Sequence, residues 1–335
     1  MVSEDPTVSM RSVGGSGLGT GAPPPGRHGD VPRPRSLKSR VSTSDLLFRS
    51  VLRSGGSVAL LLMIGVGSFL GINAWRALHK AGLSFLTTQA WNANGGQFGI
   101  AAVLVGTALI AVVAVTFATV LATGTALYIS EYAPRSIKRT LIAMLDLMAA
   151  VPSVVFGLWG ERLFQVSRVD RSNPLTPLTT YSSSTFIAGI VVGLMITPIA
   201  GTVMREAFGQ APVGEREGAL ALGGTRWGMI RSVVLPFGRG AMIGGLMLGL
   251  GRALGETMAV LLIISPVYVI QPHILEHGTS SVSSLIASQY SEASSHFSIS
   301  ALMAAGLALF AITMLVNFIA AQIVSRSRSG ALSEA

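Results

Sequence analysis

Charged side chains are scarce in this sequence of 335 residues, because only 12% are Asp, Glu, Lys or Arg, whereas 50% are hydrophobic. Soluble domains usually carry about 25% charged residues, so much of the surface is expected to face lipid. The formal net charge of +9 would indicate a nucleic-acid partner in a soluble protein. Most basic residues instead flank apolar runs, as in membrane proteins, and no nucleic-acid partner is expected.

Cysteine is absent, which excludes disulfides and thiolate metal sites. No secretory signal peptide is found, because the first strongly apolar run begins after residue 56 and no clear cleavage pattern follows it. The sequence also has no G-x-x-x-x-G-K-[ST] phosphate loop, since GGTRWGM lacks the Lys and Ser/Thr that hold phosphate and magnesium. We therefore predict that the chain is not an enzyme, and that a separate chain hydrolyses any ATP that drives it.

A metal site is also not expected. His273, Glu276 and His277 form H-x-x-E-H, which has the spacing of an inverted zinc motif. Pro272 and Gly278 bracket this motif too tightly for a long helix, and no third ligand follows. The motif is better interpreted as part of an external loop over residues 266–298.

Six apolar segments are each long enough to cross a membrane as a helix of roughly 20 residues. The segments are continuous rather than alternating, and a membrane admits only helices or closed barrels, so helices are predicted. They cover residues 57–75, 98–128, 140–160, 186–204, 240–265 and 299–324. The fold class is therefore all-α, a polytopic membrane protein with six transmembrane helices.

The segments before and after these helices are expected to be cytoplasmic tails. Residues 1–50 are rich in Gly, Pro, Ser and Arg and cannot bury enough apolar surface to fold, so we predict a disordered N-terminal tail. Residues 51–326 then form the membrane domain, and 327–335 form a C-terminal tail. With both termini inside, the cytoplasmic segments hold 18 of the 24 Lys and Arg residues, as the positive-inside rule requires.

The cytoplasmic loop 205–239 predicts two short helices at a bend. Pro212 is placed to open the first helix and Gly223 to end it. Thr225 is placed as the N-cap of a second helix that ends before Pro236. An ordinary connecting loop is the alternative interpretation.

Two charged residues, Arg252 and Glu256, fall inside the fifth apolar segment, near the middle of the bilayer if the helix begins at Gly240. Their spacing of four residues predicts that both project from one helical face. Such charges indicate either a solute pathway or a buried structural ion pair. Arg252 favours an oxyanion as solute, because its guanidinium matches two oxygens at once. Thr257 is either a further hydroxyl donor or bonded to its own helix backbone.

Other features of the spans predict packing rather than chemistry. Asp146 in the third span is interpreted as structural, and Pro152 and Pro198 are expected to kink their helices. Glycines four residues apart in the fifth span predict close helix contacts, at positions 240 and 244, 245 and 249, and 251 and 255.

The loop 205–239 resembles the EAA loop of ABC importer permeases, whose pattern is E-A-A, three residues, G, nine residues, I, one residue, L-P. Here Glu217 begins the pattern, and it departs from the family only at Gly218 and Val233. The resemblance implies that residues 213–224 form a coupling helix that docks on an ATPase subunit. The residues to which this role is carried are Glu215, Glu217, Gly218, Ala219 and Gly223.

A narrower resemblance is to the phosphate permeases of the PstC and PstA type, and more to PstC. It rests on YISEYAP at 128–134, VPSVVFGLWG at 151–160 and GRALGET at 251–257. It implies the MetI-like type I architecture in the bacterial plasma membrane, and a transport role for Arg252 and Glu256. The implied partners are a PstA-type permease, an ATPase dimer that holds ATP and Mg, and an external phosphate-binding protein. Permeation of sulfate or molybdate, and a secondary anion transporter without an ATPase, remain as alternatives.

Overall fold

The computed structural model describes residues 43–92, 97–165, 183–270, 273–275 and 278–328. The chain divides into two compact units, Met1–Val58 and Ala59–Ala335. In the first unit the described residues, 43–58, are helical, so the part of the predicted disordered tail at 43–50 is in fact helix, with Asp45 in the favourable first turn. The rest of the predicted N-terminal tail lies outside the described residues. Apart from the beginning of helix α1 (Thr43–Ala81), the features discussed below belong to the second unit.

Helices make up most of the described residues. The long helices are α1 (Thr43–Ala81), α3 (Ala101–Leu127), α7 (Thr185–Gly209), α10 (Leu235–Leu254) and α13 (His296–Arg328). The shorter helices are α2 (Ser84–Thr87), α4 (Arg135–Ala150), α5 (Ser153–Gln165), α8 (Val213–Ala221), α9 (Arg226–Met229), α11 (Met258–Ile263) and α12 (Val282–Gln289). Two π-helical turns, η1 (Tyr128–Tyr132) and η3 (Ile230–Val234), follow α3 and α9 directly. One small exception to the all-α prediction is an antiparallel pair, β1 (Trp91–Asn92) with β2 (Gln97–Phe98).

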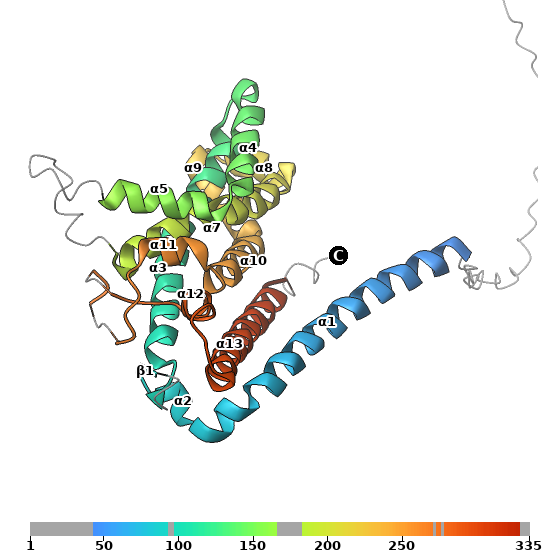
Figure 1. The fold of residues 1–335 in the computed structure, drawn as a ribbon. Helices are drawn as coiled ribbons and strands as arrows, with labels where there is room; N and C mark the ends of the chain where they lie inside the picture. Colours follow the sequence, from blue (N-terminus) through green and yellow to red (C-terminus); the bar gives the residue numbers. More distant parts are fainter. Residues whose placement is uncertain (1–42, 93–96, 166–182, 271–272, 276–277, 329–335) are drawn as a thin grey trace, which may run out of the picture. The chain divides into compact units, whose positions relative to one another are not determined.

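Five stretches of helix are long and apolar enough to cross a membrane, and the α4–α5 pair is a sixth candidate. They correspond to the six segments predicted from the sequence, but the third is not a single straight span. Helices α4 and α5 meet at an angle of 91° (Figure 1). The bend lies at Val151 and Pro152, where proline lacks an N–H and forces the residue before it out of helical geometry; Val151 accordingly has φ −65° and ψ 129°. In contrast, α7 continues through Pro198.

The centre of the second unit is a close contact between α3 and α7. One face of α3 presents four fully buried alanines at intervals of four residues, at positions 114, 118, 122 and 126. On α7 a glycine permits the same close approach, since a Cβ atom on Gly193 would lie 2.9 Å from the carbonyl oxygen of Ala114. Helix α10 packs on α7 in the same way, because a Cβ on Gly245 would lie 3.0 Å from the Ala200 carbonyl oxygen. Small residues therefore let these backbones approach closely, as predicted for the pair Gly245 and Gly249.

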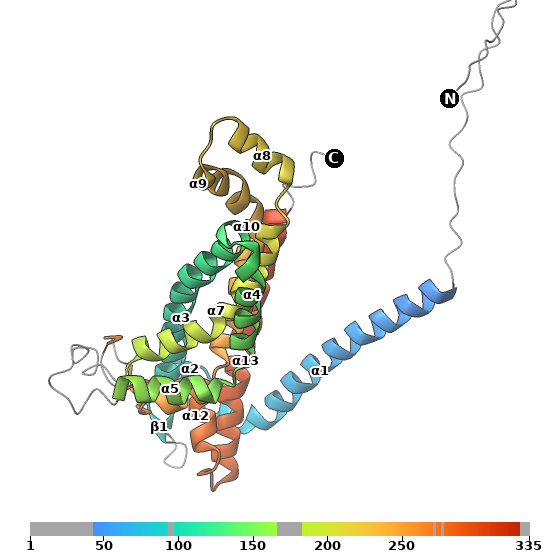
Figure 2. The same cartoon turned by 90° about the horizontal axis from the view of Figure 1, so that it is seen from above.

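The second unit has two different ends. Helices α8 and α9 lie at one end, and α2 with the β1–β2 pair lies at the other (Figure 2). At the latter end Phe98 contacts Phe85 and Phe297, with ring centroids 5.9 Å and 5.1 Å apart, and the Lys80 ammonium lies 4.7 Å from the Phe297 ring centroid. Aromatic rings capped by a cation suit a membrane–water boundary.

Candidate functional site

The fifth predicted span is broken at Gly255–Thr257, between α10 and α11. The prediction of one continuous helix that carries Arg252 and Glu256 on the same face is therefore wrong. Gly255 was interpreted as a packing glycine, but a Cβ there would meet only the helix's own backbone, and the residue instead ends α10. Among the described residues no ion pair joins Arg252 to Glu256.

Glu256 lies inside the protein, with only 7% of its surface exposed. Its carboxylate Oε1 accepts a hydrogen bond from the backbone N–H of Ala259 at 3.2 Å, and so caps the first turn of α11. Its backbone carbonyl accepts a hydrogen bond from the Ser283 hydroxyl at 2.6 Å. Glu256 therefore connects the break between α10 and α11 to α12 as well as to the start of α11.

The first turn of α12 is a hydroxyl-rich layer next to this break. Ser281 and Ser284 form a capping box, in which each side chain bonds the other residue's backbone N–H. The Thr107 hydroxyl of α3 accepts a hydrogen bond from the Val282 N–H at 3.0 Å. Sequence reasoning missed this layer, although the run TSSVSS at 279–284 stands out among apolar neighbours and was available as a signal.

Arg252 has the opposite environment from Glu256. Its side chain is exposed, and no hydrogen bond or ion pair links it to another described residue. Thr257 donates its hydroxyl proton to the Gly255 carbonyl at 3.2 Å, which is the local backbone bond anticipated as an alternative. The guanidinium is therefore free to meet a solute or another subunit, whereas Glu256 and Thr257 are engaged in forming the break.

A groove of about 620 Å³ lies beside Gly251, the residue next to Arg252, between α10 and α13. Its polar element is Asn317 of α13, whose Oδ1 would lie 3.3 Å from a Cβ on Gly251. The remaining lining residues are small or apolar: Gly244, Met247, Leu248, Ala320, Ala321 and Val324. The predicted glycine contact at 251 is thus with α13, while Gly244 has open space around it.

The predicted coupling segment forms two helices at a bend. Gly223 has a φ of +82°, a conformation that glycine adopts without strain, and it follows the end of α8. The Thr225 hydroxyl accepts a hydrogen bond from the Gly228 N–H at 3.1 Å, which confirms its N-cap role. Pro236 does not end the second helix, because the π-helical turn η3 joins α9 to α10 without a break and the helix continues through Pro236.

Helix α8 has no buried residue, and Glu215, Glu217 and Gly218 are exposed while Ala219 is half-buried. Arg216, on the same helix, forms an ion pair with Glu131 of η1, with Nη1 3.1 Å from Oε1. Sequence reasoning missed this pair, because the two residues are 85 positions apart and nothing local links them.

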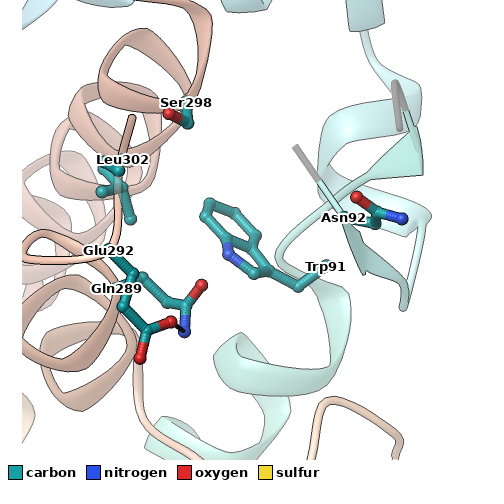
Figure 3. A pocket seen from close by; sticks show the side chains of 7 residues that line it. Trp91, Asn92, Gln289, Glu292, Ser298 and Leu302 are labelled. Carbon is teal, nitrogen blue, oxygen red and sulfur yellow. Dashed lines mark hydrogen bonds between the residues drawn. The ribbon is translucent and has the colours of Figure 1, made fainter. Parts of the chain in front are cut away.

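The opposite end of the unit contains a small cavity of about 110 Å³ (Figure 3). The indole of Trp91 points from β1 toward Leu302, Gln289 and Glu292, and the Gln289 amide donates to the Glu292 carboxylate at 3.0 Å. A carboxylate in the lining makes this cavity unsuitable for an oxyanion. Near this cavity, burial raises the pKa of the Tyr268 hydroxyl. A hydrogen bond with Ser288 lowers the pKa and the Glu292 charge raises it further. The net effect is a raised pKa, so this phenol stays neutral at physiological pH.

Two minor sequence predictions concern charged side chains elsewhere. Asp146 is exposed on α4. Of the H-x-x-E-H motif only His273 is described, whereas Glu276 and His277 lie outside the described residues. Among the described side chains, no three His, Asp or Glu residues gather as metal ligands would.

Comparison with known proteins relates the chain to one family of membrane proteins. Residues 118–329 match the family described as binding-protein-dependent transport system inner membrane component. The chain is 32% identical over 310 residues to the phosphate transport system permease protein PstC of Mesorhizobium japonicum, a match that covers 87% of this chain and 94% of the relative. It is 36% identical over 301 residues to the phosphate transport system permease protein PstC 2 of Mycobacterium tuberculosis, covering 85% and 93%.

Solved structures share the fold at low sequence identity. A bacterial ABC transporter involved in the import of the acidic polysaccharide alginate has a chain that superposes with a TM-score of 0.53 and 17% identity, covering 84% of this chain and 98% of that one. An inward-facing form of the MetNI methionine ABC transporter gives a TM-score of 0.52 and 14% identity, covering 68% and 97%. At these identities the likeness concerns the architecture alone, which is that of type I ABC importer permeases.

Proposed function

The chain belongs to the binding-protein-dependent transport system inner membrane component family, and we propose that it moves inorganic phosphate across the bacterial plasma membrane. It is a multi-pass permease subunit of an ATP-driven importer, not an enzyme. The observation that carries the substrate is the match to phosphate permeases along 85% and 87% of the chain. The exposed guanidinium of Arg252 supports the same class of solute, because Arg matches phosphate oxygens bidentately.

Arg252 acts in this proposal as a transient counter-charge for the anion. A tight internal site is not required, because conduction needs binding that is weak enough for the anion to leave again. Glu256 does not compete with phosphate for Arg252, since its carboxylate is bonded to the start of α11. Its role is to hold the backbone break in place, and through Ser283 to hold α12 beside it.

The partners follow from the family and from the surface of α8. An external phosphate-binding protein delivers the solute to the outer end, which we assign to α12 and the β1–β2 pair. An ATPase dimer, which holds ATP and Mg, docks on α8 and the turn after it, at Glu215, Glu217, Gly218, Ala219 and Gly223. A related PstA-type permease completes the pore and contributes further positive charge at the level of Arg252.

The orientation that this arrangement requires has both termini in the cytoplasm. Two segments that the charge distribution assigns to the inside, 129–139 and 205–239, contact each other through Glu131 and Arg216. The Lys138 ammonium also donates to the Ser130 carbonyl at 3.4 Å within the first of these segments. Their shared position at one end of the unit supports the assignment.

Uptake by the reconstituted complex tests the proposal. Proteoliposomes are prepared with this chain, its permease partner and the ATPase. The binding protein is added on the side of the vesicle membrane that the outer end of the permease faces. Uptake is then assayed with labelled phosphate, sulfate and molybdate. We expect ATP-dependent phosphate uptake that excess sulfate does not inhibit. Preferred uptake of sulfate or molybdate would assign another oxyanion, and uptake without the ATPase would indicate a secondary transporter.

A further inference from the structure

The coupling helix α8 is attached to the rest of the unit by very few side chains. All of its residues are exposed except Arg216 and Ala219, which are half-buried. Arg216 extends away from the exposed face, and its partner Glu131 has a side chain that is only 5% exposed. The guanidinium also donates to the Phe208 carbonyl near the end of α7. One arginine therefore joins α8 both to α7 and to the π-helical turn after α3.

Tyr132, the residue after Glu131, makes a second contact of the same kind. The guanidinium carbon of Arg226 lies 5.5 Å from the Tyr132 ring centroid, within cation–π range. Arg216 and Arg226 stand on either side of the turn at Gly223, so the turn between α8 and α9 is held at two points against adjacent residues of η1.

The ion pair between Arg216 and Glu131 is placed to transmit force between α8 and η1. A charge pair sheltered from water is strongly dependent on its geometry, because loss of one partner leaves the other charge uncompensated. Helix η1 continues directly from α3, so a displacement of Glu131 is passed to the end of α3. On the α3 side this contact with α7 is made by alanines, which have no rotamers with which to absorb such a displacement.

The other end of this path reaches the broken fifth span. Thr107 of α3 accepts a hydrogen bond from the backbone of Val282, and the next residue, Ser283, bonds the carbonyl of Glu256. Bonded contacts thus run from α8 through Glu131 and α3 to the break beside Arg252. A continuous path alone does not establish coupling, so its decisive element must be tested directly.

We propose that Glu131 and Arg216 are positioning residues that make α8 and the end of α3 move as one piece, so that movement of the ATPase subunits reaches the transport pathway. The Arg226–Tyr132 contact supports this clamp. The proposal rests on the proposed function in one respect, that α8 is the element on which an ATPase acts.

The test compares Glu131→Gln, Arg216→Gln and the double variant in the reconstituted complex. Arg205→Gln is the matched control, because Arg205 is equally sheltered but pairs at 3.5 Å with its neighbour Glu206 on the same helix, so it joins no two elements. The measured quantity is phosphate transported per ATP hydrolysed, with co-purification of the subunits as a check on assembly. We expect each single variant to hydrolyse ATP but to lose about tenfold in this ratio, within the usual range of coupling energies. The double variant should lose no more than either single variant, and the control should match wild type.

A second measurement does not depend on transport. Because the chain contains no cysteine, spin labels can be placed on it at Val213→Cys of α8, outside the residues assigned to ATPase docking, and at Tyr128→Cys of η1, both exposed. The distance between them should stay the same with and without ATP in the assembled complex, and should change with ATP once Glu131→Gln is added. Arg205→Gln should leave the distance constant.

Each result decides between the two proposals. Wild-type ratios in assembled Glu131→Gln, or an equal loss in Arg205→Gln, would overturn the clamp. If Glu131→Gln prevents assembly, a wild-type label distance that changes with ATP overturns it, and a constant distance supports it. A wild-type complex that transports no phosphate contradicts the proposed function instead, while the label distances still decide whether the clamp exists.

Discussion

The carboxylate of Glu256 accepts a hydrogen bond from the backbone N–H of Ala259, three residues along the chain, at 3.2 Å. This relationship gives an acidic residue within an apolar region a local structural role. The carboxylate bonds the otherwise unpaired N–H of a new helix turn and also lies where the helix dipole favours negative charge. The break between α10 and α11 is therefore a specified feature of the span.

Replacing Glu256 by Ala should destabilise the subunit, because the first turn of α11 then loses its cap inside the protein. Loss of a side-chain cap costs about 1 kcal/mol. Glu256→Gln should cost less, since its amide oxygen can still accept the Ala259 N–H. Thermal unfolding of the purified complex in detergent measures both variants. Equal unfolding temperatures for Glu256→Ala and wild type would contradict the capping role.

Arg252→Gln should reduce phosphate uptake strongly while leaving subunit assembly unchanged, because the side chain is exposed and bonds no other described residue. Arg252→Lys should retain part of the activity, since it keeps the charge but loses the bidentate fork. Arg239→Gln, a neutralisation of another exposed arginine on α10, is the control and should transport normally. Normal import by Arg252→Gln would remove Arg252 from the pathway.

Gly157→Ala should weaken the packing of α5 on α11. A Cβ at this position would lie 2.8 Å from the Cα of Ala259, a backbone atom that cannot rotate away. Overpacking of this kind costs about 1–3 kcal/mol. Gly124→Ala in α3 is the matched control, because apart from the backbone of its own helix no atom would lie within 4 Å of a Cβ there. Differential scanning fluorimetry should show a lower unfolding temperature for Gly157→Ala only.

Gly223→Ala should strain the turn after α8, because φ of +82° is unfavourable for residues with a Cβ by about 1 kcal/mol or more. The nearby Gly218→Ala should be tolerated, since it has open space and introduces the alanine usual in the family's pattern. Helix propensity should even favour it by about 1 kcal/mol. Hydrogen exchange over residues 213–224 in the assembled complex measures both effects. Faster exchange in Gly218→Ala than in Gly223→Ala would contradict this account.

The spans and the coupling segment could be predicted from the sequence because their signals are local. Apolar length locates the spans, and Gly223 and Thr225 mark the bend by conformational preference and capping. Pro152 predicts a kink, but the angle of that kink depends on how α4 and α5 pack. The break at Gly255 was hidden, because glycine serves equally in close packing and in ending a helix.

The contacts that organise the site were less accessible from sequence. The Glu131–Arg216 pair joins residues 85 positions apart, and no spacing rule links them. Arg252 and Glu256 were expected to share a face because four residues make about one helical turn, which holds only while the helix continues. A tertiary bond from Ser283 and a local bond from Ala259, both to Glu256, favour the interruption instead.

The alanine face between α3 and α7 also decides where the subunit can flex. The alanines of α3 have no alternative rotamers and the two backbones lie close together, so we expect this contact to resist bending, whereas the interruptions at 151–152 and 255–257 lack continuous helical hydrogen bonding. We therefore expect bending to occur mainly at these two interruptions, while α3 and α7 turn together as one rigid pair. We expect a subunit built this way to convert a small rotation at the end that carries α8 into a change of backbone angle at residues 255–257.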